Sequence, residues 1–361
     1  MNNRYKAVSI IKVIIYVVLL FLAFKKRILY ISQTSKDIYA YERAISDLFS
    51  GTNPYLWSIE SYSNPDDPGN HGFVYLPGIL YLYGSIYIFC LLFQLPYVVL
   101  WKIPILLADF GVAFLIFRLL KDKKYTERLL GVCLWLFNPY SFLRSGYTYI
   151  DPLPTLLALL AIIYLERDSV LSGTFYALSV LVKTFPIILF PIFIIRSENK
   201  MKFLLSGLLV SLLFFLPFLF DLNDFVTMLN GTFFIHGNRF IQGRPLLFYI
   251  SYYYNIEFFQ IIPFKVYSFL SIVAPWILVS VLGTVLKGID KYILATVSFL
   301  TFYVITPVFN RTYILWAIPF LVMCGFKFNN KVACYALLCG YWLFFYFYLV
   351  QWKDGFHVWH P

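Results

Sequence analysis

Charged residues are scarce in this sequence. Only 13% of its 361 residues are Asp, Glu, Lys or Arg, whereas 61% are hydrophobic. Soluble domains carry about a quarter charged residues, so one aqueous core could not hide this share of apolar side chains. Several apolar runs approach the ~20 residues that cross a bilayer as a helix. The composition therefore excludes an ordinary soluble protein and predicts an all-α, polytopic membrane protein.

Cysteine is also sparse, and the common cofactor motifs are absent from the sequence. The five cysteines lie in apolar runs without metal-like spacing, which predicts that they pack as small hydrophobic residues. No HExxH, CxxC, GxGxxG or P-loop pattern occurs, so zinc, dinucleotide and ATP chemistry have no support. We expect no cofactor, while a divalent metal stays an open alternative.

The net charge of +11 is carried mainly by short breaks between the apolar runs. No aromatic–basic module typical of nucleic-acid binding accompanies it. The positive-inside rule therefore assigns the breaks to the cytoplasmic face, with membrane lipids rather than nucleic acid as partners. The strongest breaks are residues 121–128, 196–202, 287–291 and 327–331.

An even number of crossings between successive basic breaks predicts about eleven spans, with the N-terminus in the cytoplasm. The first run, 7–24, is expected to stay as a signal-anchor. The run 74–94 fits this scheme only as a re-entrant or interfacial helix before a full span at 98–119. A basic break on the outer face is the alternative. The run 170–195 is predicted to break at Lys183.

We predict one membrane domain over residues 1–361, with no internal repeat. It comprises a catalytic module at 1–220, an outer loop at 221–265 and C-terminal spans at 266–361.

The segment "SKDIYAYERAISDLFSGTNPY", residues 35–55, predicts a short amphipathic helix outside the first span. Ser35 is the expected N-cap, Asp37 lies in the first turn and Gly51 ends the helix. Such a helix lies in the membrane interface or against the bundle. Asp37 alone would be an ordinary first-turn aspartate that complements the helix dipole. The apolar face of this predicted helix is formed by Ile38, Tyr41, Ile45, Leu48 and Phe49, opposite Glu42 and Arg43.

A second acidic position precedes another apolar run. Asp151 is followed by Pro152 and Pro154, a pattern typical of a helix start. It is either an N-cap or a group that faces a polar cavity beside Arg144. Lys183 lies within an apolar run, so it is either functional or extends its ammonium to the membrane surface. Asp109, also within an apolar run, needs a buried partner.

The order of these motifs resembles the GT-C superfamily of membrane glycosyltransferases. An outer Asp before "NPY", then "YLP", "KIPILLADFGVAFLIFRLL", "NPY", "ID", "LVKTFPIILFP" and "NRTYILWAIPF" follow one another. The chain is most similar to the polyprenol-phosphate-mannose-dependent mannosyltransferases, over residues 35–200 and, more weakly, 300–320. The resemblance implies a GT-C-like fold with short interfacial helices in the first outer loop. It also implies transfer of a sugar, expected to be mannose, from a lipid-phosphate carrier.

In that family the first outer loop carries the catalytic acid, which matches Asp37, and a second acidic motif matches Asp151. Lys36 stands where family members often have a second acid, which leaves Asp37 to act alone. One carboxylate suffices chemically, because a polyprenyl phosphate leaves as an anion and needs no proton. A base for the acceptor hydroxyl and cations for the phosphate are still required. We expect Glu42, Tyr41 and Arg144 to contact the acceptor or sugar.

The expected phosphate-binding groups are the outer cations Lys183, His236, Arg239, Arg244 and Arg311. The arginine fork suits phosphate oxygens. Lipid headgroup contact is the competing interpretation for each of them.

Three functions are compatible with these patterns. The first is an inverting glycosyltransferase in a plasma or ER-like membrane, with its active site on the outer face and a lipid-linked or glycan acceptor. The second is a transporter or lipid flippase, which would need a polar path across the bundle. The third is a polysaccharide polymerase or ligase that acts on another acceptor.

Overall fold

The computed structural model describes most of the chain. The described residues are 2–33, 37–63, 72–138, 149–235, 241–243, 245–254, 262–327, 332, 335–336, 338–341, 343 and 358–359.

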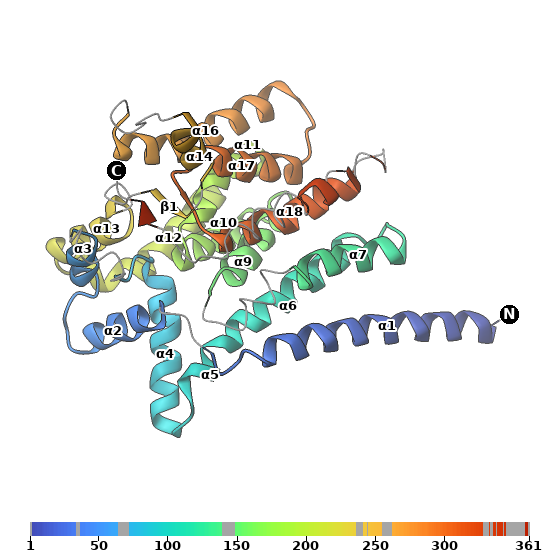
Figure 1. Ribbon diagram of the computed structural model, residues 1–361, viewed down its shortest axis with the longest axis horizontal. Helices are drawn as coiled ribbons and strands as arrows, with labels where there is room; N and C mark the ends of the chain where they lie inside the picture. The colour runs from blue at the N-terminus through green and yellow to red at the C-terminus, as the bar shows by residue number, and fades with distance from the viewer. Residues whose placement is uncertain are drawn as a thin grey trace.

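The described chain is predominantly helical, as the composition predicts (Figure 1). Its helices are α1 (Asn2–Ile28), α2 (Asp37–Phe49), α3 (Leu56–Ser63), α4 (Pro77–Phe93), α5 (Tyr97–Leu100), α6 (Lys102–Leu119), α7 (Tyr125–Leu136), α9 (Pro152–Tyr164), α10 (Ser169–Val182), η1 (Phe185–Leu189), α11 (Phe190–Arg196), α12 (Lys200–Leu219), α13 (Leu222–Thr232), α14 (Leu246–Tyr254), α16 (Phe264–Val285), α17 (Lys291–Ile305), η3 (Arg311–Tyr313) and α18 (Ile314–Lys327).

Three helices of the described chain are long and apolar enough to cross a membrane: Tyr97–Leu119, Lys200–Leu219 and Phe264–Val285. The first of them agrees with the span predicted at 98–119. Six further apolar helices have only 10–17 residues. The count of about eleven full spans is therefore not reproduced. The physical reason is that an apolar run sets hydropathy but not helix length; α9 and α18, for example, have only 13 and 14 residues.

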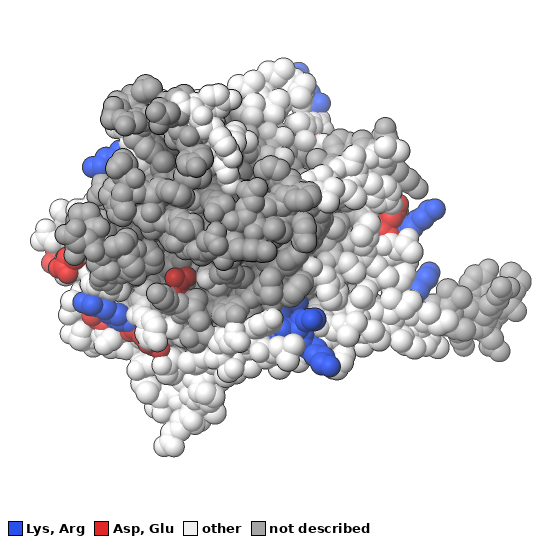
Figure 2. Space-filling view, in the orientation of Figure 1, with Lys and Arg blue, Asp and Glu red and all other residues white. Residues whose placement is uncertain are grey.

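The outer surface of these helices is apolar, and among the described residues few charged groups lie on the face shown in Figure 2. In α12, Leu209 and Leu213 are exposed by 62% and 69%, although water would disfavour both. Similar residues line α1 and α16, where Val17 and Phe269 are exposed. A surface of this kind is expected to contact lipid chains.

Three of the predicted basic breaks meet at one end of the bundle, as the positive-inside argument requires. The loop between α6 and α7, which holds the fourth, lies toward the same side in Figure 1. We call this the basic end. Its contacts are Arg196 Nη2 to the Ile289 carbonyl (2.6 Å), Lys291 to Glu166 (2.9 Å) and Lys327 to Asp290 (2.5 Å).

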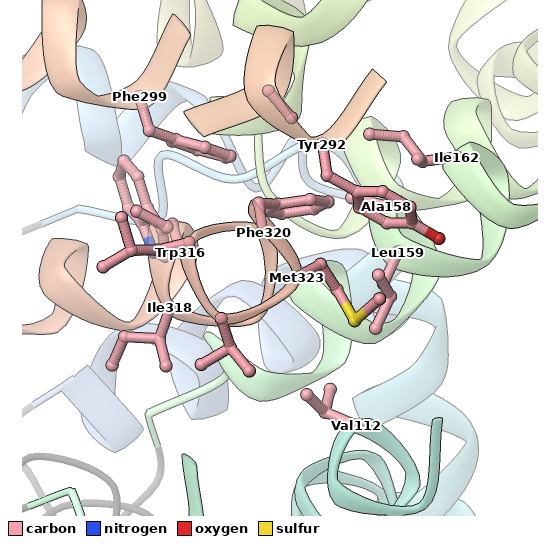
Figure 3. Packing of buried hydrophobic residues seen from close by; sticks show 14 of the residues in the cluster. Val112, Ala158, Leu159, Ile162, Tyr292, Phe299, Trp316, Ile318, Phe320 and Met323 are labelled. Carbon is pink, nitrogen blue, oxygen red and sulfur yellow. The ribbon is translucent and has the colours of Figure 1, made fainter. Parts of the chain in front are cut away.

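Helix α18 occupies the centre of the larger hydrophobic core (Figure 3). All its residues from Ile314 to Phe326 are buried, which explains why its sequence is apolar on every side. It packs against α6, α7, α9 and α17. Trp316 and Phe320 of α18 face Phe299 of α17, while Met323 lies toward α9.

A second, smaller core joins α2 and α4 to the start of α6. The helix predicted after Ser35 exists as α2, and its buried face includes Ile38, Tyr41 and Ile45. The face packs on α4 rather than lying free in lipid. Phe49 is 52% exposed, so its assignment to this face is wrong, because the helix ends there and turns at Gly51 (φ +76°). Ser35 lies outside the described residues.

Helix α4 runs across the direction of α1 and α6 in Figure 1. Helix α4 has only 17 residues and is not among the three helices long enough to cross a membrane, so the interfacial placement of 74–94 stays a prediction. Its first turn packs tightly on the end of α10, since a Cβ added at Gly78 would lie 2.7 Å from the Leu181 carbonyl oxygen.

This close approach gives a testable prediction. Gly78→Ala is expected to lower the free energy of unfolding by about 1–3 kcal/mol, because the backbone of α10 cannot yield to the new methyl group. Gly84→Ala in the same helix is the matched control: a Cβ there meets no atom within 4 Å, and it is expected to gain about 0.5–1 kcal/mol. Thermal unfolding in detergent measures both. Equal effects of the two substitutions would contradict the close packing.

The segment 221–265, predicted as a loop, contains α13 and α14. Its strand β1 (Ile241–Gly243) pairs in parallel with β2 (Val308–Phe309) and antiparallel with β3 (Val358–Trp359). This small sheet joins three segments that the sequence assigns to the outer face. They therefore lie on one side of the protein.

Candidate functional site

Asp151 is wholly buried at the start of α9. It stands at the N-cap position, but its carboxylate makes no capping hydrogen bond, so the N-cap interpretation is wrong. The Oδ1 atom instead accepts a hydrogen bond from Lys183 Nζ (2.8 Å) and another from Trp316 Nε1 (2.6 Å). The Oδ2 atom has no hydrogen-bond partner among the described residues.

Lys183 occupies the predicted break in the run 170–195. Its backbone is extended (φ −157°, ψ 137°) between α10 and η1, and Pro186 at the start of η1 prevents the α-helix from continuing. The side chain is 14% exposed and paired with Asp151. The interpretation in which this ammonium simply extends to the membrane surface is therefore wrong.

The Lys183 ammonium is also surrounded by aromatic rings. Its Nζ lies 5.7 Å from the ring centre of Tyr75 and 5.5 Å from that of Trp316. Burial lowers the pKa of Lys183, but the Asp151 carboxylate, Tyr75 and Asp37 together raise it above the ordinary value of 10.5. The group is therefore a fixed cation at neutral pH.

Asp37 begins α2 and is partly exposed. Its negative charge acts on two groups of the same site. Burial raises the pKa of the Tyr75 hydroxyl above 10.0, and Asp37 adds to that rise. The same charge contributes to the raised pKa of Lys183. Asp37 is therefore near enough to Lys183 and Tyr75 for its charge to act on both, although Asp37 and Lys183 are far apart in the sequence.

Tyr41 and Glu42 of α2 lie at the margin of this site. Tyr41 is 1% exposed and its ring lies 5.7 Å from that of Tyr75, so it packs against the site through Tyr75. Glu42 is partly exposed, and its charge acts on the Tyr97 hydroxyl of α5.

The remaining predicted site residues fall outside what the structure describes. These are Arg144, His236, Arg239 and Arg244, together with the side chain of Arg311. The described backbone around them is informative. Gly243, directly before Arg244, is paired with Phe309, two residues before Arg311. Tyr313 in turn stacks on Trp316 (3.9 Å), the residue that donates to Asp151.

The buried partner expected for Asp109 is Arg27. Arg27 Nε lies 2.5 Å from Asp109 Oδ2, and both side chains are fully buried. Arg27 also donates to the carbonyls of Ala23 (2.9 Å) and Leu136 (3.1 Å). This pair fastens the end of α1 to α6 and α7, and a buried charge with good hydrogen bonds is costly to break.

Comparison with known proteins adds no family to this picture. No family model matches the sequence, and the comparison with curated proteins also found no match.

Two residues of the site were not among the predicted ones. Tyr75 precedes the Leu76–Pro77 start of α4, and Trp316 lies in an apolar run of α18. Tryptophan in such a run needs a hydrogen-bond acceptor for its N–H, which is a usable signal. The sequence offers many acceptors, however, and does not single out Asp151.

Proposed function

We propose that the protein is an inverting glycosyltransferase that moves a hexose, in the first instance mannose, from a polyprenyl-phosphate carrier to a lipid-linked or glycan acceptor. One observation carries the proposal. Lys183 pairs with the buried Asp151 beside the ring of Tyr75, and the charge of Asp37, from a fourth segment, acts on this site. Asp151 begins α9, whereas Glu166 just beyond the end of α9 belongs to the basic end. The site therefore lies at the opposite end of the bundle.

The partly exposed Asp37 is the proposed general base. Its carboxylate takes the proton of the acceptor hydroxyl as the acceptor oxygen attacks the anomeric carbon. The bond between that carbon and the phosphate oxygen breaks, and the phosphate leaves with the electron pair. Attack opposite the leaving group inverts the anomeric centre. Its place in the first turn of α2 favours the ionised form of Asp37.

Lys183 is the proposed cation for the departing phosphate, because its side chain is 14% exposed and its ammonium is held in place by the buried Asp151. Asp151 is fully buried, so it orients Lys183 rather than meeting the substrate. The two negative charges of Asp37 and Asp151 exceed the single positive charge of Lys183, so these three groups alone would repel a phosphate. The proposal therefore includes His236, Arg239, Arg244 and Arg311 as further phosphate ligands.

The proposed setting is a multi-pass protein of a plasma or ER-like membrane. The basic end faces the cytoplasm in this scheme, since basic loops stay on that side. The site then faces the outer or lumenal side. A lipid-borne sugar is a suitable substrate there, because its carrier stays in the bilayer beside the apolar helices.

The test is sugar transfer in isolated membranes supplied with labelled polyprenyl-phosphate-mannose, with polyprenyl-phosphate-glucose as the second donor. Membranes that contain the protein are expected to pass label to a lipid or glycan fraction, whereas matched membranes without it are not. If neither sugar is transferred, the proposed function fails.

A transporter is the second candidate, favoured by the buried Arg27–Asp109 pair within the bundle. Ionisable residues inside a membrane bundle often mark an ion or substrate path. Purified protein in vesicles distinguishes the two functions. Movement of labelled lipid between leaflets without sugar transfer would favour the transporter.

A further inference from the structure

Two donors converge on one oxygen of Asp151. Lys183 Nζ and Trp316 Nε1 both bond to Oδ1, at 2.8 Å and 2.6 Å. A carboxylate can turn about its last bond. A rigid donor on one of its oxygens holds the carboxylate plane at one angle and so fixes where the lysine ammonium binds.

Trp316 is suited to be that rigid donor. Its indole is 2% exposed and lies between two rings: Phe185 at 3.9 Å with an interplanar angle of 4°, and Tyr313 at 3.9 Å and 27°. Both faces of the indole are therefore covered, and it has no room to stack on a sugar. Only its edge is available, and that edge carries the N–H that bonds to Asp151.

The same indole is linked to Lys183 in two ways: through Phe185, which is near Lys183 in the sequence, and by its short distance from the ammonium. Phe185, which stacks on it, follows Lys183 by two residues and begins η1. The Lys183 ammonium lies 5.5 Å from the indole centre. Displacement of the indole would therefore move both the carboxylate and the ammonium.

We propose that Trp316 is a positioning residue that holds Asp151, and through it Lys183, in the orientation needed for sugar transfer. The expected effect on sugar transfer rests on the proposed function. In the competing interpretation the indole only fills the core, and its N–H has no role in holding Asp151.

Trp316→Phe removes the N–H while keeping an aromatic ring between Phe185 and Tyr313. We expect kcat to fall about tenfold with KM changed less than about threefold, because charge grows on the leaving phosphate only in the transition state. Trp276→Phe is the matched control. Trp276 Nε1 donates a hydrogen bond too, but to the backbone carbonyl of Ile187 in η1 (2.9 Å), and its ring lies near that of Phe190. It is expected to keep the wild-type kcat.

A second measurement does not depend on activity. A double-mutant cycle of Trp316→Phe and Asp151→Asn by thermal unfolding in detergent should be non-additive, because the indole acts through that carboxylate. Trp276→Phe with Asp151→Asn should be additive. An additive cycle at Trp316 overturns the inference even if sugar transfer is observed. A non-additive cycle in a protein that transfers no sugar supports the Trp316–Asp151 coupling while the proposed function fails.

Discussion

Replacing Asp37 with asparagine is expected to reduce sugar transfer by about 10²–10⁴-fold at equal protein level, the usual contribution of a general base. Asparagine keeps the shape of the side chain at the start of α2 but cannot accept the acceptor proton. Buried Tyr41 and Ile45 hold α2 in the smaller core. The fold is therefore expected to survive the substitution. The measurement is label transfer from polyprenyl-phosphate-mannose in isolated membranes.

Asp47→Asn provides the matched control for Asp37. Asp47 lies on the same helix and pairs with Arg43 at 3.9 Å, and a partly exposed pair of this kind contributes little to stability. Transfer by this variant should match the wild type. If Asp37→Asn transferred sugar as fast as Asp47→Asn, Asp37 would be a residue that only stabilises the helix start.

Lys183→Met is expected to have the second large effect, on both stability and activity. It leaves the fully buried Asp151 carboxylate without its cation. Breaking a buried ion pair from one side costs about 3–5 kcal/mol. Thermal unfolding in detergent measures the loss, and sugar transfer should fall below detection.

The double variant Lys183→Met/Asp151→Leu separates the two roles of Lys183. Replacing both members of a buried pair with apolar residues of similar volume is often neutral for stability. We therefore expect the double variant to recover most of the stability but none of the activity. Recovery of both would show that the cation only balances a buried charge.

The same logic at Arg27 and Asp109 predicts a loss of stability for Asp109→Leu.

The sequence predicted the elements well wherever local chemistry determines them. The helix at Asp37–Phe49, the break at Lys183 and the candidate span at Tyr97–Leu119 all follow from periodicity, proline and hydropathy. It could not give the number of full spans, because a membrane-like composition is compatible with short helices that are buried in a bundle, as in α18.

The sequence by itself determined that this protein is helical and apolar, that its basic breaks belong together, and that Asp37, Asp151 and Lys183 are unusual. Only the tertiary structure decided that Lys183 pairs with Asp151 and that Asp109 pairs with Arg27. It also decided that Trp316 and Lys183 donate hydrogen bonds to the same oxygen of Asp151. The reason is physical. Hydropathy and helix signals act over a few neighbouring residues, whereas a buried charge is satisfied by whichever partner packing brings within hydrogen-bond distance.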